Sequence, residues 1–451
     1  MFMLFLLNCN NLDKKYVWHP YTQMKLWNRS NNIVIESGNG FSFVDSQNKR
    51  YLDGISNMWC NVWGHDRKEI IEAMKKQLDT LPHSSLFGLV NEPSVKLAKT
   101  LTTIAKGMSK VFYTDNGSTA IEAALKIAIQ YWNNKGKTQK KNFICLKNGY
   151  HGDTIGCMSI GYVDGYFSPY KSLLLKTIKV ESPTIRHEKF GNQNFEQYID
   201  KIENILKNLS SKISGFVMES GAQIAGGVNI YPKNFQRSIS DLCKKYGILL
   251  ILDEIATGFG RLGNMIEYKA QHSEPDIVCF AKALTGGYFP LAVTLTTTDI
   301  FNEFLGDYWA KRQLFHGHTF TGHPVGCTAA LTNLELYEKL NLIRKIRNNS
   351  LVFNRLLKKF SELDICYDIR HKGMLCGIEL RKGDAPIKSI EKVPIGEYIA
   401  KESLKKGVYL RTLGNIITII PPLAIEQEDL IKIVETEYAI VQKVQHKIGR
   451  Y

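Results

Sequence analysis

One lysine in the sequence stands where an amine could act as a nucleophile. Lys282 follows the apolar run 277–280, which is typical of a buried strand, and the glycine pair at 286–287 lets backbone approach a ligand closely. Burial lowers the pKa of an amine, and an unprotonated amine can form a Schiff base with a carbonyl compound. From this stretch alone, a lysine that reaches from a strand end into water remains the alternative.

An aspartate earlier in the chain supplies a second chemical group. Asp253 ends the continuous apolar run 248–252, the pattern of a strand buried in a parallel sheet, and ligands bind at that end of such sheets. Pyridoxal phosphate needs a lysine for a Schiff base and a carboxylate that keeps its pyridine nitrogen protonated. Lys282 and Asp253 together indicate this cofactor, although Asp253 alone fits a helix cap equally well.

Two small-residue turns could complete a cofactor site. A helix is predicted over 119–132 from the spacing of its apolar residues, and free amides after Gly117 and Ser118 would attract a phosphate. Tyr150 lies between two glycines in the turn 148–153 and could cover an aromatic ring as a flat lid. Any capped helix, and any tyrosine on a surface turn, would look similar in isolation.

Two arginines and a histidine-rich stretch are further candidates for binding groups. Arg261 lies in the glycine-rich loop 256–263, and its guanidinium suits a two-point contact with a carboxylate. Arg411 ends a predicted strand and could do the same, or could simply be exposed. Residues 315–324 hold three histidines separated by glycines, without an acid or cysteine, so no metal site is predicted. Thr319 and the turn amides there favour an oxyanion or a phosphate.

The composition describes an ordinary globular protein with a basic balance. The chain has 451 residues, 44% hydrophobic and 22% charged, which exceeds one typical core and predicts two domains. The net charge is +15, but the lysines are dispersed, so we expect a solvated surface that attracts anionic substrates and no nucleic-acid partner. A basic scaffold or nucleic-acid-binding protein with a degenerate enzyme fold is the alternative that rests on charge.

Cysteine usage and the opening residues bear on location. The nine cysteines contain no Cys-x-x-Cys pair, which predicts reduced thiols in the cytoplasm. The apolar opening 1–7 lacks a preceding basic segment and is too short to span a bilayer, so we expect neither a signal peptide nor a membrane partner.

The order of expected elements predicts an α/β fold. Strands near 111–114, 143–146, 214–219, 248–252 and 277–280 alternate with helical stretches, which favours a doubly wound, mostly parallel sheet. Short strands at 377–380, 408–411 and 416–420 alternate with helices in the last part of the chain. We therefore expect an N-terminal arm and hairpin (1–57) joining a smaller α+β domain, a large domain (58–340) and the rest of the small domain (341–451). Residues 16–24 read as an extended arm.

Four stretches carry a family resemblance. They are Trp-His-Pro-Tyr-Thr-Gln-Met at 18–24, Asn-Gly-Tyr-His-Gly-Asp-Thr at 148–154, Asp-Glu-Ile-Ala-Thr-Gly-Phe-Gly-Arg at 253–261 and Lys-Ala-Leu-Thr-Gly-Gly at 282–287. With them the chain resembles, from about residue 16 to 422, the adenosylmethionine-8-amino-7-oxononanoate aminotransferases (7,8-diaminopelargonic acid synthases) of biotin synthesis. That family belongs to the class-III, fold-type-I pyridoxal-phosphate enzymes.

The resemblance implies a role for each matching residue. Lys282, Asp253 and Tyr150 would be catalytic, with Lys282 forming the Schiff base, Asp253 pairing with the pyridine nitrogen and Tyr150 covering the ring. Gly117 and Ser118 would bind the phosphate.

The remaining implied roles concern the second subunit and the substrates. His318 and Thr319 would reach the phosphate in the neighbouring subunit's site, which makes a homodimer with shared active sites. The implied substrate-binding residues are Tyr21, Trp59, Tyr150, Arg261, Lys282, Gly317 and Arg411. Tyr21 would stack on the adenine of the donor.

The expected reaction moves an amino group from S-adenosyl-L-methionine to 8-amino-7-oxononanoate and gives 7,8-diaminononanoate. Lysine as the donor, or another class-III ω-aminotransferase of the ornithine or aminobutyrate type, are the alternatives. Met58 stands where some members have a second tryptophan, and His318 where some have proline. Ala225 stands where the oxoglutarate-using relatives carry a glutamate, which argues against that couple.

Overall fold

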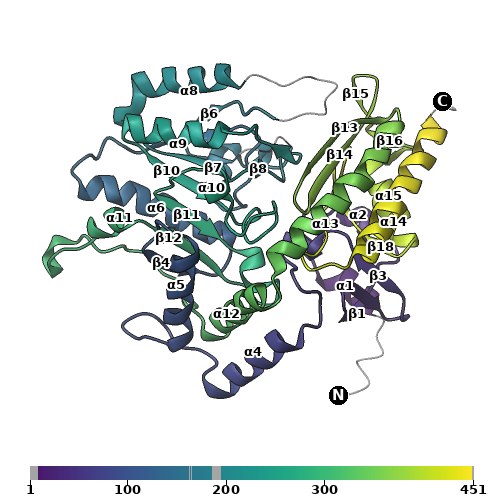
Figure 1. Ribbon diagram of the computed structural model, residues 1–451, viewed down its shortest axis with the longest axis horizontal. Coiled ribbons are helices and arrows are strands. Elements are labelled where there is room, and N and C mark those ends of the chain that lie inside the picture. The colour runs from purple at the N-terminus through teal and green to yellow at the C-terminus, as the bar shows by residue number, and fades with distance from the viewer. Residues whose placement is uncertain (1–8, 162, 164, 185–194, 449–451) are drawn as a thin grey trace.

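A seven-stranded sheet forms the centre of the larger part of the molecule (Figure 1). The computed structural model describes residues 9–161, 163, 165–184 and 195–448. In order across the sheet, the strands are β4 (Lys110–Thr114), β12 (Ala292–Thr296), β11 (Ile277–Phe280), β10 (Leu249–Asp253), β7 (Ile213–Glu219), β5 (Asn142–Leu146) and β6 (Ile178–Val180). All pairings from β11 to β6 are parallel, whereas β12 is antiparallel to both of its neighbours.

The central strands of this sheet are buried on both sides because helices cover both of its faces. Alternate side chains of β10 and β11 belong to two separate cores: Leu250 and Phe280 pack in one, and Ile251 and Cys279 in the other. Helix α6 (Gly117–Asn134) covers the second core, while α5 (Glu92–Ile104), α8 (Glu196–Leu209), α9 (Phe235–Tyr246) and α12 (Pro324–Lys339) cover the first. This layering confirms the predicted doubly wound, mostly parallel α/β sheet.

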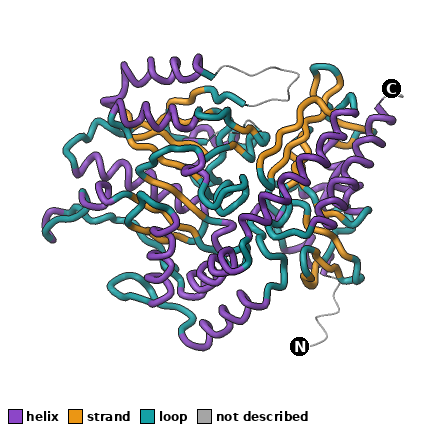
Figure 2. Tube along the Cα trace, in the orientation of Figure 1, coloured by secondary structure: helices purple, strands orange, loops and turns teal. Residues whose placement is uncertain are grey.

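Two smaller sheets lie beside the large one (Figures 1 and 2). One has the order β1 (Ile35–Asn39), β2 (Ser42–Asp45), β3 (Arg50–Asp53) and β18 (Val408–Tyr409), and the other has β13 (Cys366–Lys372), β14 (Leu375–Lys382), β20 (Ile416–Ile419) and β19 (Arg411–Leu413). The helices α13 (Leu342–Leu357), α14 (Ile395–Lys405) and α15 (Gln427–Ile448) pack with them. Because β18 pairs in parallel with β3, a late segment of the chain completes the sheet that the early segment begins.

The remaining elements are short or peripheral. The helices are α1 (Cys9–Tyr16), α2 (Met24–Trp27), α3 (Ser56–Trp59), α4 (Lys68–Thr80), α7 (Ile155–Ile160), α10 (Glu267–Ala270) and α11 (Thr298–Asn302). The strands are β8 (Ala222–Gln223), β9 (Asn229–Ile230), β15 (Ala385–Pro386), β16 (Ser389–Ile390) and β17 (Val393–Pro394). Within the described residues, no helix combines the length and the hydropathy that a bilayer crossing requires.

The N-terminal arm differs from the prediction. Residues 16–24 are not continuously extended, because a turn at 20–21, where Tyr21 has a φ of 51°, interrupts the stretch between α1 and α2. The stretch between them carries Trp18, whose side chain is 88% exposed, and Tyr21. The apolar opening at residues 1–7 lies outside the described residues, and all nine cysteines lie inside them as free thiols.

Strand register brings three polar residues to one edge of the large sheet. Asp253 lies opposite Glu219 of β7 on one side and opposite Cys279 of β11 on the other. Lys282 follows Cys279 by three residues, in the 3-10 turn η5 (Lys282–Thr285). The carboxyl ends of parallel strands meet at one edge, so Glu219, Asp253 and Lys282 converge there.

Candidate active site

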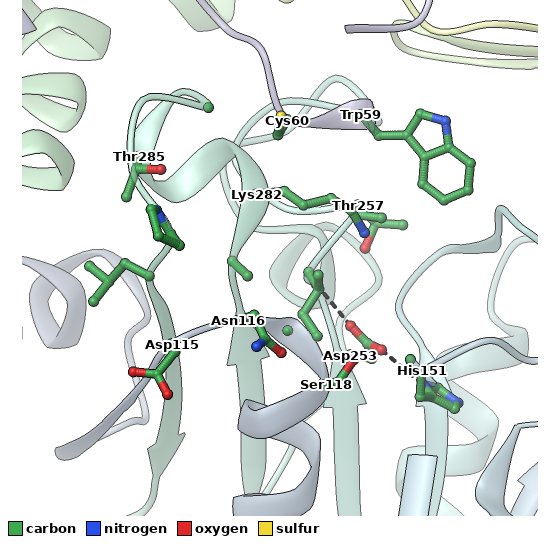
Figure 3. A pocket seen from close by; sticks show the side chains of 18 of the residues that line it. Trp59, Cys60, Asp115, Asn116, Ser118, His151, Asp253, Thr257, Lys282 and Thr285 are labelled. Carbon is green, nitrogen blue, oxygen red and sulfur yellow. Dashed lines mark hydrogen bonds and ion pairs between the residues drawn. The ribbon is translucent and has the colours of Figure 1, made fainter. Parts of the chain in front are cut away.

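A cavity of 480 Å³ lies at this edge and is lined largely by residues at or just after the carboxyl ends of β4, β5, β7, β10 and β11. Of the positions predicted from the sequence, six line it: Trp59, Gly117, Ser118, Tyr150, Asp253 and Lys282. Figure 3 shows Asp253 and Lys282 on neighbouring strand ends, with Trp59 above and the first residues of α6 below. The cavity therefore gathers an amine, a carboxylate and a helix N-terminus from stretches far apart in the sequence.

Asp253 is buried and held by two hydrogen bonds. Its Oδ1 accepts from the backbone N–H of Ile255 at 2.9 Å, and its Oδ2 lies 2.8 Å from Nδ1 of His151. Burial alone would lower the pKa of His151, but the hydrogen bond and the negative charge of Asp253 outweigh it and raise the pKa. With its pKa raised, the imidazole can donate its Nδ1 proton to Oδ2 of Asp253.

Glu219 is a second buried acid beside this pair. Its two carboxylate oxygens accept hydrogen bonds from the backbone N–H groups of Tyr150, at 3.1 Å, and Ile224, at 3.0 Å. Burial raises the pKa of Glu219 to about 7, the charge of His151 opposes that rise, and Asp253 adds to it. Glu219 therefore fixes the backbone of the proposed ring cover.

Lys282 has a strained backbone and a depressed pKa. Its φ of 48° lies in the left-handed region, which costs a residue other than glycine about 1–3 kcal/mol. Burial lowers the pKa of its amine, and the negative charge of Asp253 opposes that shift. The Nζ atom lies 5.2 Å from the centre of the Trp59 ring. Such strain is typical of functional sites, where the surroundings must hold the backbone in place.

The N-terminus of α6 lines the cavity through Gly117 and Ser118. Asn116 caps the helix by accepting from the N–H of Thr119. A Cβ on Gly117 would lie 2.8 Å from Ile255, and a Cβ on Gly152 would lie 2.0 Å from Oγ of Ser118. Both positions therefore require glycine, and the free amides at this helix end suit an anion.

Tyr150 lines the cavity, and Tyr21 lies beside it but outside the described lining. The ring of Tyr150 stacks at 6.2 Å on Phe167. The hydroxyl of Tyr21 donates to Oδ1 of Asp153 at 2.5 Å, and the Tyr21 ring meets that of Tyr166 edge to face. Burial, strengthened by the carboxylate of Asp153, raises the pKa of both Tyr21 and Tyr150, so both hydroxyls keep their protons.

Arg261 is not among the residues that line the cavity. Its side chain is 1% exposed and donates to the backbone oxygens of Met374, at 3.0 Å, and Pro421, at 2.7 Å, and to Oγ of Ser56, at 3.0 Å. Burial lowers its pKa to about 10. These bonds tie the large-sheet part of the chain to segments around the small sheets, and the predicted contact with a substrate carboxylate stays a prediction.

The other predicted substrate and phosphate residues also lie outside the described lining. Arg411 is exposed on β19. Gly317 and Thr319 are exposed, and Nδ1 of His318 lies 2.6 Å from Oδ2 of Asp115 in the same chain. Their roles toward a neighbouring subunit stay predictions.

His151 and Glu219 are site residues to which sequence reasoning assigned no role. His151 stands next to Tyr150 in the quoted motif, and Glu219 ends a predicted strand in the same way as Asp253. A strand-end acid on the neighbouring strand was therefore a usable signal for Glu219. His151 required the tertiary contact with Asp253, since 102 residues separate them.

The residues of the cavity fit pyridoxal phosphate. The glycine-lined helix end suits a phosphate, Asp253 suits a protonated pyridine nitrogen, and Lys282 offers an amine to an aldehyde. The hydroxyl of Thr257 lies on the same wall, buried and with no hydrogen-bond partner in the described part of the chain. It can donate to a ligand in the cavity.

Comparisons with known proteins agree with this site. The family model described as Aminotransferase class-III matches residues 24–441. The adenosylmethionine-8-amino-7-oxononanoate aminotransferase of Geobacter sulfurreducens is 41% identical over 424 residues, 93% of this chain and 94% of that protein. The crystal structure of the enzyme of that name from Methanocaldococcus jannaschii is 39% identical, with a TM-score of 0.90 over 96% of this chain and 98% of that one.

A more distant relative has been solved with a ligand. The omega transaminase from Pseudomonas jessenii in complex with PMP is 30% identical, with a TM-score of 0.90 over 97% of this chain and 98% of that one. The chain therefore belongs to the class-III aminotransferases, which are pyridoxal-phosphate-dependent transferases.

Proposed function

We propose that the protein transfers an amino group from S-adenosyl-L-methionine to 8-amino-7-oxononanoate, giving 7,8-diaminononanoate in biotin biosynthesis. The observation that carries this proposal is the near-complete match, at about 40% identity, to relatives that bear the name of this reaction. The cavity supports it with an amine and a carboxylate on adjacent strand ends.

Each residue of the cavity then has a task. Pyridoxal phosphate, when bound, supplies an electron sink for the charge left when a proton leaves the donor carbon. Lys282 would hold the cofactor through Nζ, and the same atom would then take and return the proton, for which its depressed pKa is suited. Asp253 would keep the pyridine nitrogen protonated, with His151 orienting the carboxylate.

The remaining residues would bind and exclude water. The amides after Asn116, at Gly117 and Ser118, would hold the phosphate. Tyr150 would cover the ring, with its backbone fixed by Glu219. These assignments rest on position and chemistry, and they apply equally to both half-reactions because one site serves donor and acceptor in turn.

The donor is proposed from the aromatic side chains beside the cavity. Tyr21 is 57% exposed beside Tyr150 and Asp153, where its ring can stack on an adenine. We assign Arg411, which is exposed, to a substrate carboxylate. In this proposal Arg261 contributes to the substrate pocket through α3, which carries Trp59 and which it contacts at Ser56.

We further propose a cytoplasmic homodimer with shared active sites. The loops 86–91 and 315–322 contact each other, since a Cβ on Gly317 would lie 2.6 Å from the Phe87 ring. They expose the apolar side chains Phe87, Leu89, Val90, Phe315 and Phe320. A patch of this kind next to Thr319 fits a second copy that receives Thr319 near its phosphate. For the chain itself we propose the division 1–57, 58–340 and 341–451.

The test is a comparison of amino donors with the purified protein loaded with pyridoxal phosphate. S-adenosyl-L-methionine is expected to change the cofactor absorbance and to support formation of 7,8-diaminononanoate from the keto acid. A response to lysine alone would overturn the donor. Rapid turnover of ornithine or aminobutyrate with oxoglutarate would favour the ω-aminotransferase alternative, against which Ala225 stands.

A further inference from the structure

The turn that carries Lys282 is held from behind by one fully buried amide. Asn333 of α12 is 0% exposed, and its Nδ2 donates to the backbone oxygens of Ala283 and Leu284, each at 2.9 Å. These two residues follow Lys282 directly in η5. The amide therefore holds the backbone directly after Lys282, whose φ lies in the left-handed region.

The other end of the same amide is also occupied. The indole Nε1 of Trp63 donates to Oδ1 of Asn333 at 2.8 Å, and Trp63 is itself buried. The turn has a second contact with this segment, because the N–H of Val62 donates to the oxygen of Gly286 at 3.3 Å. Asn333 thus links α12, the segment after Trp59 and the lysine turn.

Asparagine matches this environment by its chemistry. Two carbonyl oxygens need N–H donors and one indole N–H needs an acceptor, and a primary amide supplies both in one planar group. An aspartate of the same size would set a carboxylate oxygen against two carbonyl oxygens. A leucine would remove all three bonds. The indole N–H and the oxygen of Leu284 would lose their partner, whereas the oxygen of Ala283 would keep only the N–H of Gly286, at 3.1 Å.

We propose that Asn333 is a positioning residue for Lys282, which sets the direction of its amine by holding the carbonyls of Ala283 and Leu284. Asn333 itself is not among the described residues that line the cavity. The proposal rests on the proposed role of Lys282. It extends that role by identifying the side chain that holds the strained backbone of the lysine turn in place.

The test compares Asn333→Asp and Asn333→Leu with matched variants of another buried asparagine. Asn349 of α13 is 1% exposed and donates to the oxygen of Ile425 at 2.8 Å, far along the chain from the lysine turn. Asn349→Asp and Asn349→Leu report what loss of a buried amide does to folding alone. Trp63→Phe removes the indole N–H while keeping an aromatic ring.

The first readout uses protein without cofactor, so that it does not depend on which reaction the enzyme catalyses. A small neutral acylating reagent labels Lys282 over a pH series, and peptide mass spectrometry gives the labelling rate and its midpoint. We expect both Asn333 variants to shift the midpoint or lower the rate at Lys282 at least about fivefold, and Trp63→Phe to have a smaller effect in the same direction. The Asn349 variants keep the wild-type profile.

The second readout is steady-state kinetics of the loaded enzyme. A displaced amine lowers kcat while leaving KM for both substrates within about twofold, because substrate contacts are unchanged. The proposal would be overturned if the Asn333 variants were destabilised as much as the Asn349 variants but kept the wild-type labelling profile and kcat. If the Asn333 variants label abnormally but wild-type protein lacks the proposed transamination, the proposed function fails and the positioning role stands.

Discussion

His151 and Asp253 form a buried pair at the edge of the large sheet, with Nδ1 of the imidazole 2.8 Å from Oδ2 of the carboxylate. The side chains are 1% and 5% exposed, so water screens their interaction poorly. The imidazole thereby fixes one oxygen of the group proposed to face the pyridine nitrogen.

His151→Phe is expected to weaken cofactor binding. An aromatic ring is kept, but Oδ2 of Asp253 loses its partner and the carboxylate can turn or take up a proton. By analogy with partners behind metal ligands, the loss should be about 10–100-fold in affinity. A titration of cofactor-free protein with pyridoxal phosphate, followed by tryptophan fluorescence, measures it. Affinity equal to wild type would contradict the orienting role.

The same pair predicts a pH dependence of folding stability. The pKa of His151 is raised in the folded protein, so its contribution is fully present below the unfolded value near 6.5 and is lost as pH rises through the folded value. Urea midpoints of cofactor-free wild type and His151→Gln should therefore differ more at pH 6 than at pH 9. A gap that widened toward high pH would show that the sign is wrong.

Glu219 predicts a second pH effect. Burial raises its pKa to about 7, above the usual 4.5. The folded protein therefore binds the proton more tightly than the unfolded chain, and wild-type protein should lose stability, by about 3 kcal/mol at most, as the pH rises from about 4.5 to about 7. Glu219→Gln should flatten that loss and lower kcat, because a carboxamide cannot accept from both Tyr150 and Ile224. Urea midpoints at pH 5 and pH 8, with initial rates, measure both.

A matched control separates folding from catalysis at this position. Glu437 on α15 is also a fully buried acid whose pKa burial raises, to about 8, and its Oε1 accepts from Ser403 at 2.7 Å. Glu437→Gln should alter the pH dependence of stability in the same way without lowering kcat. Equal activity losses in both variants would argue against a site role for Glu219.

Local patterns were enough to predict that Asp253 and Lys282 lie at the ends of buried strands, for a physical reason. Lys282 and Asp253 each follow an apolar run, and a buried parallel strand needs such a run and ends where ligands bind. The antiparallel direction of β12 was not predicted, although the short connection after β11 carries a signal. A parallel neighbour would need a crossover of a dozen or more residues, and residues 281–291 form only a turn and a loop.

Long-range contacts explain what local patterns could not supply. Arg261 sits in a glycine-rich loop that looks suited to a ligand, but the groups that receive its hydrogen bonds are 113 and 160 residues away. The hold of Asn333 on the lysine turn likewise depends on the packing of α12, about 50 residues further along the chain. No periodicity in either segment encodes such a partner.

The two arginines predicted to bind carboxylates should behave differently when replaced by methionine. Arg261→Met leaves the buried oxygens of Met374 and Pro421 without donors, which should cost about 3 kcal/mol of unfolding free energy. Arg411→Met removes an exposed charge, so stability should stay within about 0.5 kcal/mol while KM for a carboxylate substrate rises. Urea denaturation and initial rates measure both. The reverse pattern would make Arg261 the carboxylate receptor.

The shared-site dimer predicts complementation between two inactive variants. Thr319→Ala removes a group proposed to serve the other subunit, and Lys282→Ala removes one that serves its own. A mixed dimer then has one site with both changes and one intact site, so mixing equal amounts should restore about one quarter of wild-type activity when subunits exchange freely. Sedimentation velocity checks that the mixture is dimeric. Absence of any recovery in exchanged dimers would place Thr319 in its own subunit's site.

Lys282→Ala should abolish covalent cofactor attachment and lower turnover by at least about 10⁴-fold, because one amine both anchors the cofactor and moves the proton. Borohydride reduction followed by peptide mass spectrometry detects the attachment. Lys140 is the matched control: burial lowers its pKa as well, to about 8, and its Nζ donates to the oxygens of Ser210 and Gly247, each at 2.9 Å. Lys140→Met should lower stability and leave kcat and attachment intact. A depressed pKa is thus common to both lysines, and what separates them is the carboxylate and the open cavity that Lys282 alone of the two faces.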